Sequence, residues 1–184
     1  MPLHYTPVVR HLGASDRAFV EGLSAHFERH HPRLGFLASV LWNRGYRTVR
    51  GLVRLAWGTR ARRTAVLEAV LGFLKPRGFD SVDDLSLWVF GALGDVEGLK
   101  RVERAAYTRP APRVVEGQRE YEVDAVVGVK KTGGGRLLYR VAWHGYGPSE
   151  RTWEDRAGLS NTLALRNWQS GKRAAYISRS VFLS

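Results

Sequence analysis

Residues 121–154 read YEVDAVVGVKKTGGGRLLYRVAWHGYGPSERTWE, and this stretch decides the fold of the C-terminal part of the chain. Residues 121–125 alternate apolar and acidic side chains, and residues 138–143 show the same two-residue repeat, which is typical of β-strands. The three glycines at 133–135 separate the two runs and predict a hairpin turn. A third short strand is expected to begin at residue 152. The stretch therefore predicts a small antiparallel sheet.

The flanking sequence indicates where this sheet domain begins and ends. Leu163, Leu165 and Trp168 predict a closing helix packed across the sheet. Residues 108–118 contain two prolines and no helical or alternating pattern, so we expect a linker there. The expected fold class is α+β, with a helical, basic domain over residues 1–107, a linker over 108–118, a sheet-and-helix domain over 119–170 and a C-terminal tail over 171–184.

Residues 12–107 have the apolar spacing of five or six short helices packed as a bundle. Phe19, Leu23 and Phe27 recur every four residues on one face of the first helix. The expected N-caps are Ser15 or Asp16 for the first helix and Ser81 for a later one, and the last helix is expected to begin at Asp95. In the helix after Ser81, the residues expected to be buried are Val82, Leu85, Trp88 and Val89.

The composition indicates a soluble, intracellular protein that attracts polyanions. The 184 residues carry a formal net charge of +12, and no run of apolar residues is long enough for a membrane span or a signal peptide. The absence of cysteine excludes disulfides and thiolate sites. Five of the 29 basic residues are lysines, which leaves 24 arginines. That bias fits either a GC-rich coding sequence or phosphate binding, for which arginine is the better side chain.

The most concentrated charge lies in residues 44–63, which contain seven arginines and no acidic residue. Arg47, Arg50 and Arg54 have helical spacing, so we expect a solvent-facing basic stripe opposite the apolar residues of that helix. Such a stripe could be only a solvated face, but its lack of compensating charge favours contact with DNA or RNA. The candidate nucleic-acid-binding residues are Arg44, Arg47, Arg50, Arg54, Arg60, Arg62 and Arg63.

Three histidines are the only other group that suggests chemistry in the helical region. His26 and His30 lie one helical turn apart, and His31 is adjacent. Two histidines without a further ligand or a Glu-containing motif are weak support for zinc, so we expect surface or partly buried histidines, no metal site and no cofactor. The sequence contains no nucleophile elbow, P-loop or dinucleotide fingerprint. We therefore expect a protein that is not an enzyme.

The C-terminal motifs resemble those of the chromodomain family. The matching residues are the run EYEV at 120–123, the run YRVAWHGY at 139–146, and TWE at 152–154 with Leu159 after it. The resemblance covers residues 119–169, and the order, spacing and type of the residues all agree with the family. It implies a three-stranded sheet closed by a helix, with Trp153 in the core under the sheet.

The resemblance also implies a binding site for methylated lysine on a histone H3-type tail. Tyr121, Trp143 and Tyr146 match the aromatic cage of the family, although in an ordinary sheet they could be core residues. A methylated ammonium keeps its charge but loses hydration, so electron-rich ring faces bind it well. The bound peptide is expected as an added strand. Its expected contacts are Glu120, Glu122, Val123, Glu150 and Gly158.

The chain departs from the family beside the expected peptide groove. Gly158 stands where the family usually has an asparagine that holds the peptide, and Asp155 stands where it usually has proline. Ala142 and His144 replace basic residues. The residues therefore support the cage better than they support the groove.

Three functional hypotheses fit the sequence. The leading one is a nuclear chromatin reader whose chromodomain binds a methylated tail while the helical domain contacts nucleic acid or a partner protein. The second is a structural or adaptor protein of viral or retroelement origin that uses the chromodomain for targeting and the helical domain for self-association. The third is an RNA-binding protein whose chromodomain no longer binds peptide.

Overall fold

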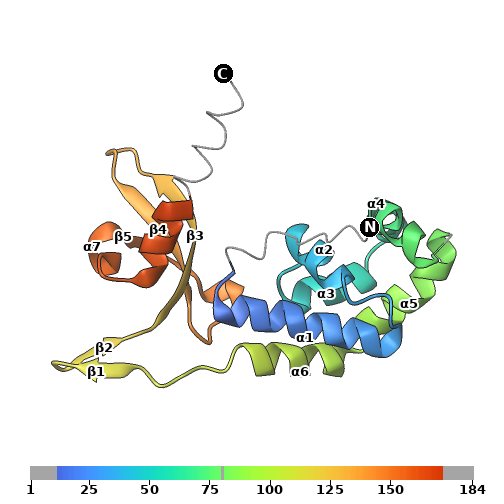
Figure 1. Cartoon of the computed structure of the whole chain (residues 1–184), viewed down its shortest axis with the longest axis horizontal. Coiled ribbons are helices and arrows are strands. Elements are labelled where there is room, and N and C mark those ends of the chain that lie inside the picture. Colours follow the sequence, from blue (N-terminus) through green and yellow to red (C-terminus); the bar gives the residue numbers. More distant parts are fainter. Residues whose placement is uncertain (1–11, 80, 172–184) are drawn as a thin grey trace. The chain divides into compact units, whose positions relative to one another are not determined.

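The computed structural model describes residues 12–79 and 81–171. They fall into two compact units, one of residues 16–107 and one that joins residues 12–15 to residues 108–171. The first is helical, and the second contains an antiparallel sheet, so the predicted α+β class is confirmed (Figure 1). Among the described residues, no helix has the length and apolar character needed to cross a membrane.

Helices account for most of the first unit, as the apolar spacing predicts. The expected N-cap Ser81 is confirmed, because its hydroxyl accepts the Asp84 N–H at 3.2 Å. Asp95, where the last helix was expected to begin, is instead the N-cap of that helix, and its carboxylate accepts the Gly98 N–H at 2.9 Å. The helices are α1 (Ala14–His30), α2 (Leu37–Asn43), α3 (Val49–Ala56), α4 (Arg60–Leu74) with a 3-10 turn η2 (Lys75–Arg77), α5 (Val82–Gly94) and α6 (Val96–Ala106).

The cap predicted for the first helix is wrong. Helix α1 begins at Ala14, one residue before the proposed caps Ser15 and Asp16. The carboxylate of Asp124 accepts the N–H groups of Ala14 and Ser15 at 2.9 and 2.8 Å, in the unit that contains residues 12–15. A side chain from 110 residues away thus satisfies these donors, which local sequence could not reveal.

Residues of all six helices contribute to the core of the first unit, in which α1 lies alongside α6 (Figure 1). Phe19, Leu23 and Phe27 are fully buried, as predicted. A side chain at Gly22 would come within 3.0 Å of Val102, so glycine at this position lets the two helices approach closely. The predicted burial of Trp88 on α5 is wrong, because this ring remains partly exposed, with its centroid 5.1 Å from that of the His31 ring.

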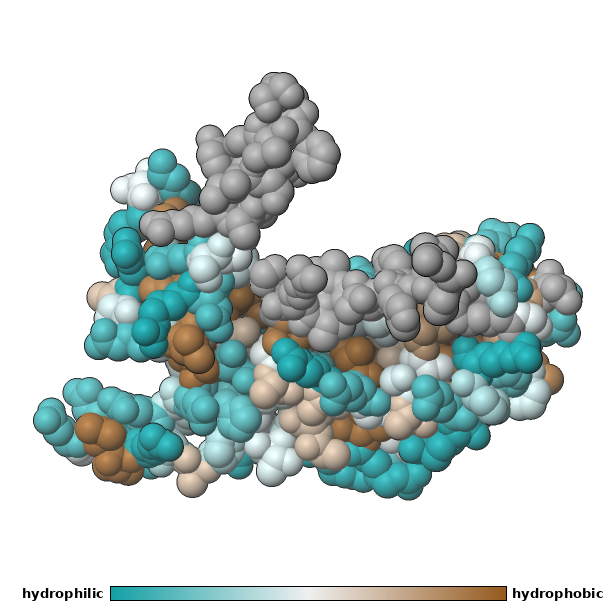
Figure 2. Space-filling view, in the orientation of Figure 1, coloured by the Kyte–Doolittle hydropathy of each residue, from teal (hydrophilic) through white to brown (hydrophobic). Residues whose placement is uncertain are grey.

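The second unit is built on a three-stranded antiparallel sheet with the order β3-β4-β5. Its strands are β3 (Val123–Lys131), β4 (Leu137–Trp143) and β5 (Thr152–Asp155), so the predicted hairpin and third strand are confirmed. Two further strands, β1 (Arg113–Val115) and β2 (Gln118–Glu120), form a ribbon that begins within residues 108–118, where the sequence predicted no regular structure. Figure 2 shows apolar surface on this ribbon, which carries the exposed Val114 and Val115.

A short helix α7 (Arg156–Leu159) and a helix over residues 163–171 complete the core of this unit. Residues 172–184 of the expected C-terminal tail lie outside the described residues. Two predicted core residues are exposed instead. The predicted burial of Leu163 is wrong, because residues two apart on a helix cannot share a face and Leu165 takes the buried position. The predicted burial of Trp153 is also wrong, because β5 is an edge strand and the ring stays 39% exposed. Lys130 Nζ lies 4.3 Å from the centroid of this ring.

Candidate functional site

Three aromatic rings that are separated in sequence cluster at one end of the sheet. The ring centroids of Tyr121 and Trp143 are 6.3 Å apart at an interplanar angle of 68°, and those of Tyr121 and Tyr146 are 6.1 Å apart at 79°. Both pairs therefore meet edge to face, a preferred geometry of aromatic pairs. The three residues implied by the family resemblance are thus brought together, with Tyr121 between the other two.

Strand register and one glycine turn produce this arrangement. Val123 pairs with Trp143, and the His144 N–H extends the pairing by donating to the Glu122 carbonyl at 2.9 Å. The sequence predicted that Tyr121 belongs to this strand, but Tyr121 lies two residues before β3 begins. The chain then turns at Gly145, whose φ is +75°, and Tyr146 N–H donates back to the Trp143 carbonyl at 3.1 Å. A side chain at Gly145 would collide with the Thr108 carbonyl, so only glycine fits.

Trp143 contributes both to the aromatic cluster and to the hydrophobic core. Its ring is partly buried against the core residues of the sheet. Its Nε1–H donates to Thr152 Oγ1 at 2.9 Å, which fixes the indole orientation. Tyr121, by contrast, is 45% exposed. The cluster therefore has one wall held by the core and another that is open to solvent.

A pocket of about 410 Å³ adjoins Tyr121 and Tyr146. The segment before β1 forms one wall, and the chain around Tyr121 forms the other. Glu120 and Glu122 give the second wall a negative charge, which favours a cationic ligand. The lining residues are Pro110, Ala111, Pro112, Arg113, Glu120, Tyr121, Glu122, His144 and Tyr146.

Glu150 lies beside the aromatic cluster but is already paired. Arg109 forms an ion pair with one carboxylate oxygen of Glu150, and the other oxygen accepts the Gly147 N–H at 3.1 Å. The guanidinium carbon of Arg109 also lies 5.5 Å from the centroid of the Tyr146 ring. The chain thus places its own cation where the family resemblance suggests a ligand cation. Sequence reasoning missed Arg109 because it lies in the expected linker.

The remaining predicted peptide contacts lie in different surroundings. Val123 packs against the hydrophobic core, and its side chain is partly buried. Gly158 is exposed in α7, and its N–H donates to Asp155 Oδ1 at 2.9 Å. Asp155 thereby caps α7, which explains a carboxylate where the family usually has proline. Ala142 is buried, so a basic side chain could not fit there.

Comparison with known families supports this part of the chain. Residues 121–170 match the model of the Chromo (CHRromatin Organisation MOdifier) domain, and the rest of the chain matches no family model. Chromo domains are binding modules that in general read methylated lysine in chromatin, and they are not a catalytic family. The comparison with curated proteins gave no match, and neither did the comparison with solved structures.

The arginines of residues 44–63 do not form a single helical stripe. Arg47 precedes α3, where its Nε–H donates to the Trp42 carbonyl at 3.4 Å and its guanidinium lies 5.5 Å from the Trp42 ring. Arg63 lies 5.2 Å from the Phe90 ring, and Arg44 donates to the Ala69 carbonyl at 3.5 Å. Of the seven, those that are exposed and have no side-chain partner in the described part of the chain are Arg50, Arg54, Arg60 and Arg62.

Sequence reasoning also missed an exposed indole among these arginines. Trp57 follows α3 in the turn that leads to α4, and its side chain is 78% exposed. Arg54 and Arg60 flank it in sequence. The available signal was a tryptophan in a short, arginine-rich turn, since an exposed aromatic between basic residues is typical of single-stranded nucleic-acid binding.

Proposed function

We propose that this chain is a chromatin reader that binds methylated lysine on a histone H3-type tail through Tyr121, Trp143 and Tyr146. One observation carries the proposal: the three rings converge edge to face beside a pocket with acidic residues on its wall. The match of this segment to the Chromo family agrees with this chemistry. Action on chromatin would take place in the nucleus.

The ring arrangement suits a methylated ammonium better than an unmodified one. Methylation retains the positive charge while it replaces N–H donors with apolar groups, so the ion loses hydration without losing its attraction to ring faces. Each good cation–π contact contributes about 0.5 to 2 kcal/mol. Three such walls therefore discriminate through shape and polarity, with no need for a hydrogen bond to the ammonium.

The charge around the pocket suits a basic peptide. Glu120 and Glu122 lie on either side of Tyr121, and both are exposed. Their carboxylates would attract the lysines and arginines of a histone-type tail and raise the association rate at low salt. The peptide backbone would add to the chain around Tyr121 as an extra strand, and Glu150 would contact the ammonium once Arg109 moves away.

The direct test is a binding series on the full chain. Peptides of an H3-type tail that carry mono-, di- or trimethyl-lysine at one position are compared with the unmethylated peptide by fluorescence anisotropy. We expect at least tenfold tighter binding of one methylated form, which corresponds to about 1.4 kcal/mol. Equal affinity for every methylated peptide and its unmethylated counterpart would exclude the reader function.

We also propose that the turn between α3 and α4 contacts nucleic acid. Trp57 offers a ring for base stacking, and the exposed Arg50, Arg54, Arg60 and Arg62 offer charge to phosphates. The first turn of α4 carries basic residues and no acidic one, although the helix dipole disfavours cations at this end. Local charge there is thus unfavourable for the isolated helix and favourable for a bound polyanion.

A second substitution series tests this contact against the adaptor hypothesis. Trp57→Ala should weaken single-stranded DNA binding by about 1 to 3 kcal/mol and duplex binding much less, because only unpaired bases can stack on the ring. Gel filtration of the same full-chain protein gives its mass. A chain that binds no nucleic acid but elutes as an oligomer would instead support self-association through the helical unit.

A further inference from the structure

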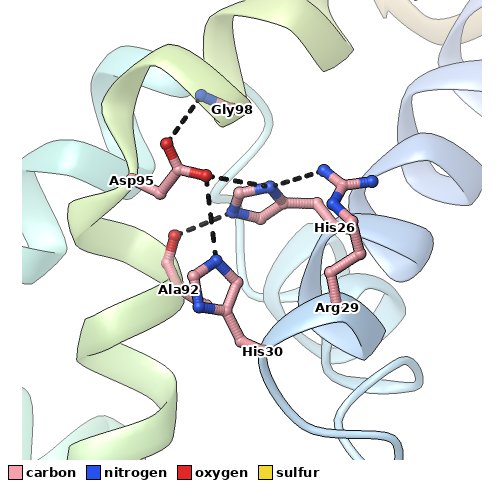
Figure 3. A network of polar contacts seen from close by, with 6 residues as sticks. All are labelled: His26, Arg29, His30, Ala92, Asp95 and Gly98. Carbon is pink, nitrogen blue, oxygen red and sulfur yellow. Dashed lines mark hydrogen bonds and ion pairs between the residues drawn. The ribbon is translucent and has the colours of Figure 1, made fainter.

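The helical unit contains a polar cluster that is separate from the aromatic cluster and from the arginines of residues 44–63. His26 and His30 project from one face of α1 toward Asp95, at the junction of α5 and α6 (Figure 3). His26 Nδ1 lies 3.9 Å from Asp95 Oδ2, and His30 Nε2 lies 3.8 Å from the same oxygen. All three potential ligand atoms lie within 4.8 Å of one another.

The surrounding hydrogen bonds orient these atoms inward. His26 Nε2 lies 2.8 Å from the Ala92 carbonyl, so this nitrogen carries the proton and Nδ1 presents its lone pair to the cluster. Asp95 uses Oδ1 to accept the Gly98 N–H at 2.9 Å, which leaves Oδ2 directed at the histidines. A histidine whose second nitrogen donates to a backbone carbonyl is the usual arrangement of a metal ligand.

The cluster also sits in space that the backbone leaves open. A side chain at Gly98 would collide with Asp95 and come within 2.6 Å of His26 Cε1, so glycine at this position makes room for the convergence. His26 is fully buried, contrary to the partly buried or surface position expected from sequence. Burial lowers the pKa of His26, which keeps its ring neutral near pH 7, and the hydrogen bond from Gly98 lowers the pKa of Asp95.

We propose that His26, His30 and Asp95 bind a divalent transition metal of the zinc type. Two imidazoles and one carboxylate are a common zinc ligand set, and water would complete a tetrahedron. With bonds of about 2.0 to 2.1 Å, ligand atoms around zinc lie about 3.3 Å apart, so each histidine nitrogen needs to approach Asp95 Oδ2 by only about half an ångström. The two histidine nitrogens lie within 4.8 Å of each other and would also move closer. The bound ion would link α1 to the α5–α6 junction.

One side chain of the protein competes for this position. Arg29 Nη2 lies 3.1 Å from His26 Nδ1, where it donates to the lone pair that a metal would take. The Arg29 side chain is exposed, so it can move into solvent when a metal binds. Its presence indicates that the cluster attracts a cation, and it predicts that removal of Arg29 strengthens metal binding.

The test is a titration of the chelator-treated full chain with Zn²⁺ alone by calorimetry and with Co²⁺ by visible absorption. Wild-type protein should bind one ion, raise its Tm on binding and show the absorption of tetrahedral Co²⁺. Asp95→Asn preserves the helix cap, and His30→Gln changes a partly exposed residue, so both variants should fold. Each should lose at least tenfold in affinity, and Arg29→Gln should gain affinity.

His31→Gln is the matched control, because it removes the neighbouring histidine that lies outside the cluster. It should bind the ion as tightly as wild type. A wild-type chain that binds no stoichiometric ion overturns the proposal. Wild-type affinity in the Asp95→Asn and His30→Gln variants, or an equal loss in His31→Gln, also overturns it, because the ion would then be held elsewhere.

Discussion

The aromatic cluster of the sheet unit and the arginine-rich turn of the helical unit have opposite electrostatic character. Glu120 and Glu122 flank Tyr121, although Arg113 also lines the pocket, whereas arginines without acidic residues flank Trp57 in sequence. Both surfaces combine aromatic rings with charge, but the first is complementary to a cation and the second to a polyanion. The sign of the nearby charge therefore distinguishes the proposed methyl-lysine site from the proposed nucleic-acid site, which exposed aromatic residues alone would not do.

This difference suggests that the two units can act on one chromatin fibre without competing. A histone tail is basic and DNA is acidic, so the arginines near Trp57 would repel the tail, and Glu120 and Glu122 would repel DNA. Two weak contacts on one chain reinforce each other through effective concentration when the connecting segment spans both sites. Substitutions that alter one surface should change the affinity for its ligand and leave the affinity for the other ligand unchanged.

The largest expected effect comes from Trp143→Ala. This substitution removes the wall of the aromatic cluster that the core supports, so affinity for a methylated peptide should fall at least tenfold. It should also lower the free energy of unfolding by about 3 kcal/mol, since the indole packs against the core and Trp→Ala substitutions in cores cost about 3 to 5 kcal/mol. Chemical denaturation and peptide titration measure the two effects separately.

Trp153→Ala is the matched control for that substitution. Trp153 is a tryptophan of the same sheet, but it lies on the edge strand beneath Lys130 and outside the aromatic cluster. Peptide affinity should remain within about twofold of wild type. If the two alanine variants lose affinity equally, the loss reflects general damage to the sheet, and the cluster does not bind the methylated lysine.

The next largest effect concerns the salt dependence of DNA binding. Three of the exposed arginines that have no side-chain partner among the described residues are replaced by glutamine, as Arg50→Gln with Arg54→Gln and Arg60→Gln. This should reduce the slope of log affinity against log salt by up to about 2.7. This value follows if each arginine neutralises one phosphate, because every neutralised phosphate of duplex DNA contributes about 0.9 to the slope. Titrations at several salt concentrations measure the slope, while methyl-lysine affinity should not change.

A second triple variant removes the same formal charge from arginines that the protein already engages. Arg44, Arg47 and Arg63 contact the Ala69 carbonyl, the Trp42 ring and the Phe90 ring respectively. Their replacement by glutamine should change the salt slope less than the first triple variant does. Equal slopes in the two variants would mean that net charge alone, and not an exposed arginine surface, attracts the nucleic acid.

The sequence predicted the sheet unit well, and its errors have local physical causes. Tyr121, Trp143 and Tyr146 were grouped through the resemblance to the chromodomain family, and strand register and one glycine turn explain how the structure brings them together. Trp153 was misplaced because the family resemblance put it in the core, whereas in this chain the ring on the edge strand β5 stays exposed. Arg109 was missed because its contact with Glu150 spans 41 residues and follows from the path of a segment without a periodic pattern.

The helical unit was predicted at the level of its elements but not of its sites. Apolar spacing and capping residues found the helices, since these are local properties. Asp95 was recognised only as the start of the last helix, although one of its carboxylate oxygens faces histidines about 70 residues earlier. A pair of histidines four residues apart was the available signal, and packing of α1 against the α5–α6 junction supplied the third group.

A smaller effect is expected at Gly158, where the family usually has asparagine. The position is exposed, and an added Cβ would lie 3.6 Å from Asp155 Oδ1, which is an ordinary contact. Gly158→Asn should tighten methylated-peptide binding by about 0.5 to 1.5 kcal/mol if its amide reaches the peptide backbone. Gly158→Ala controls for the stiffer backbone. No difference between these two variants would show that the peptide runs elsewhere.

The smallest effect should come from Arg109, which tests whether the sheet unit binds its own cation. A ligand ammonium at Tyr146 and Glu150 must first displace this guanidinium. An exposed cation–π contact and an exposed ion pair are each worth about 1 kcal/mol or less, so Arg109→Gln should tighten methylated-peptide binding about two- to fivefold. Arg113→Gln removes the same charge from the pocket wall without touching these two partners. If both variants gain equally, repulsion of the basic peptide explains the gain. A gain specific to Arg109→Gln indicates that this arginine occupies the place of the ligand cation.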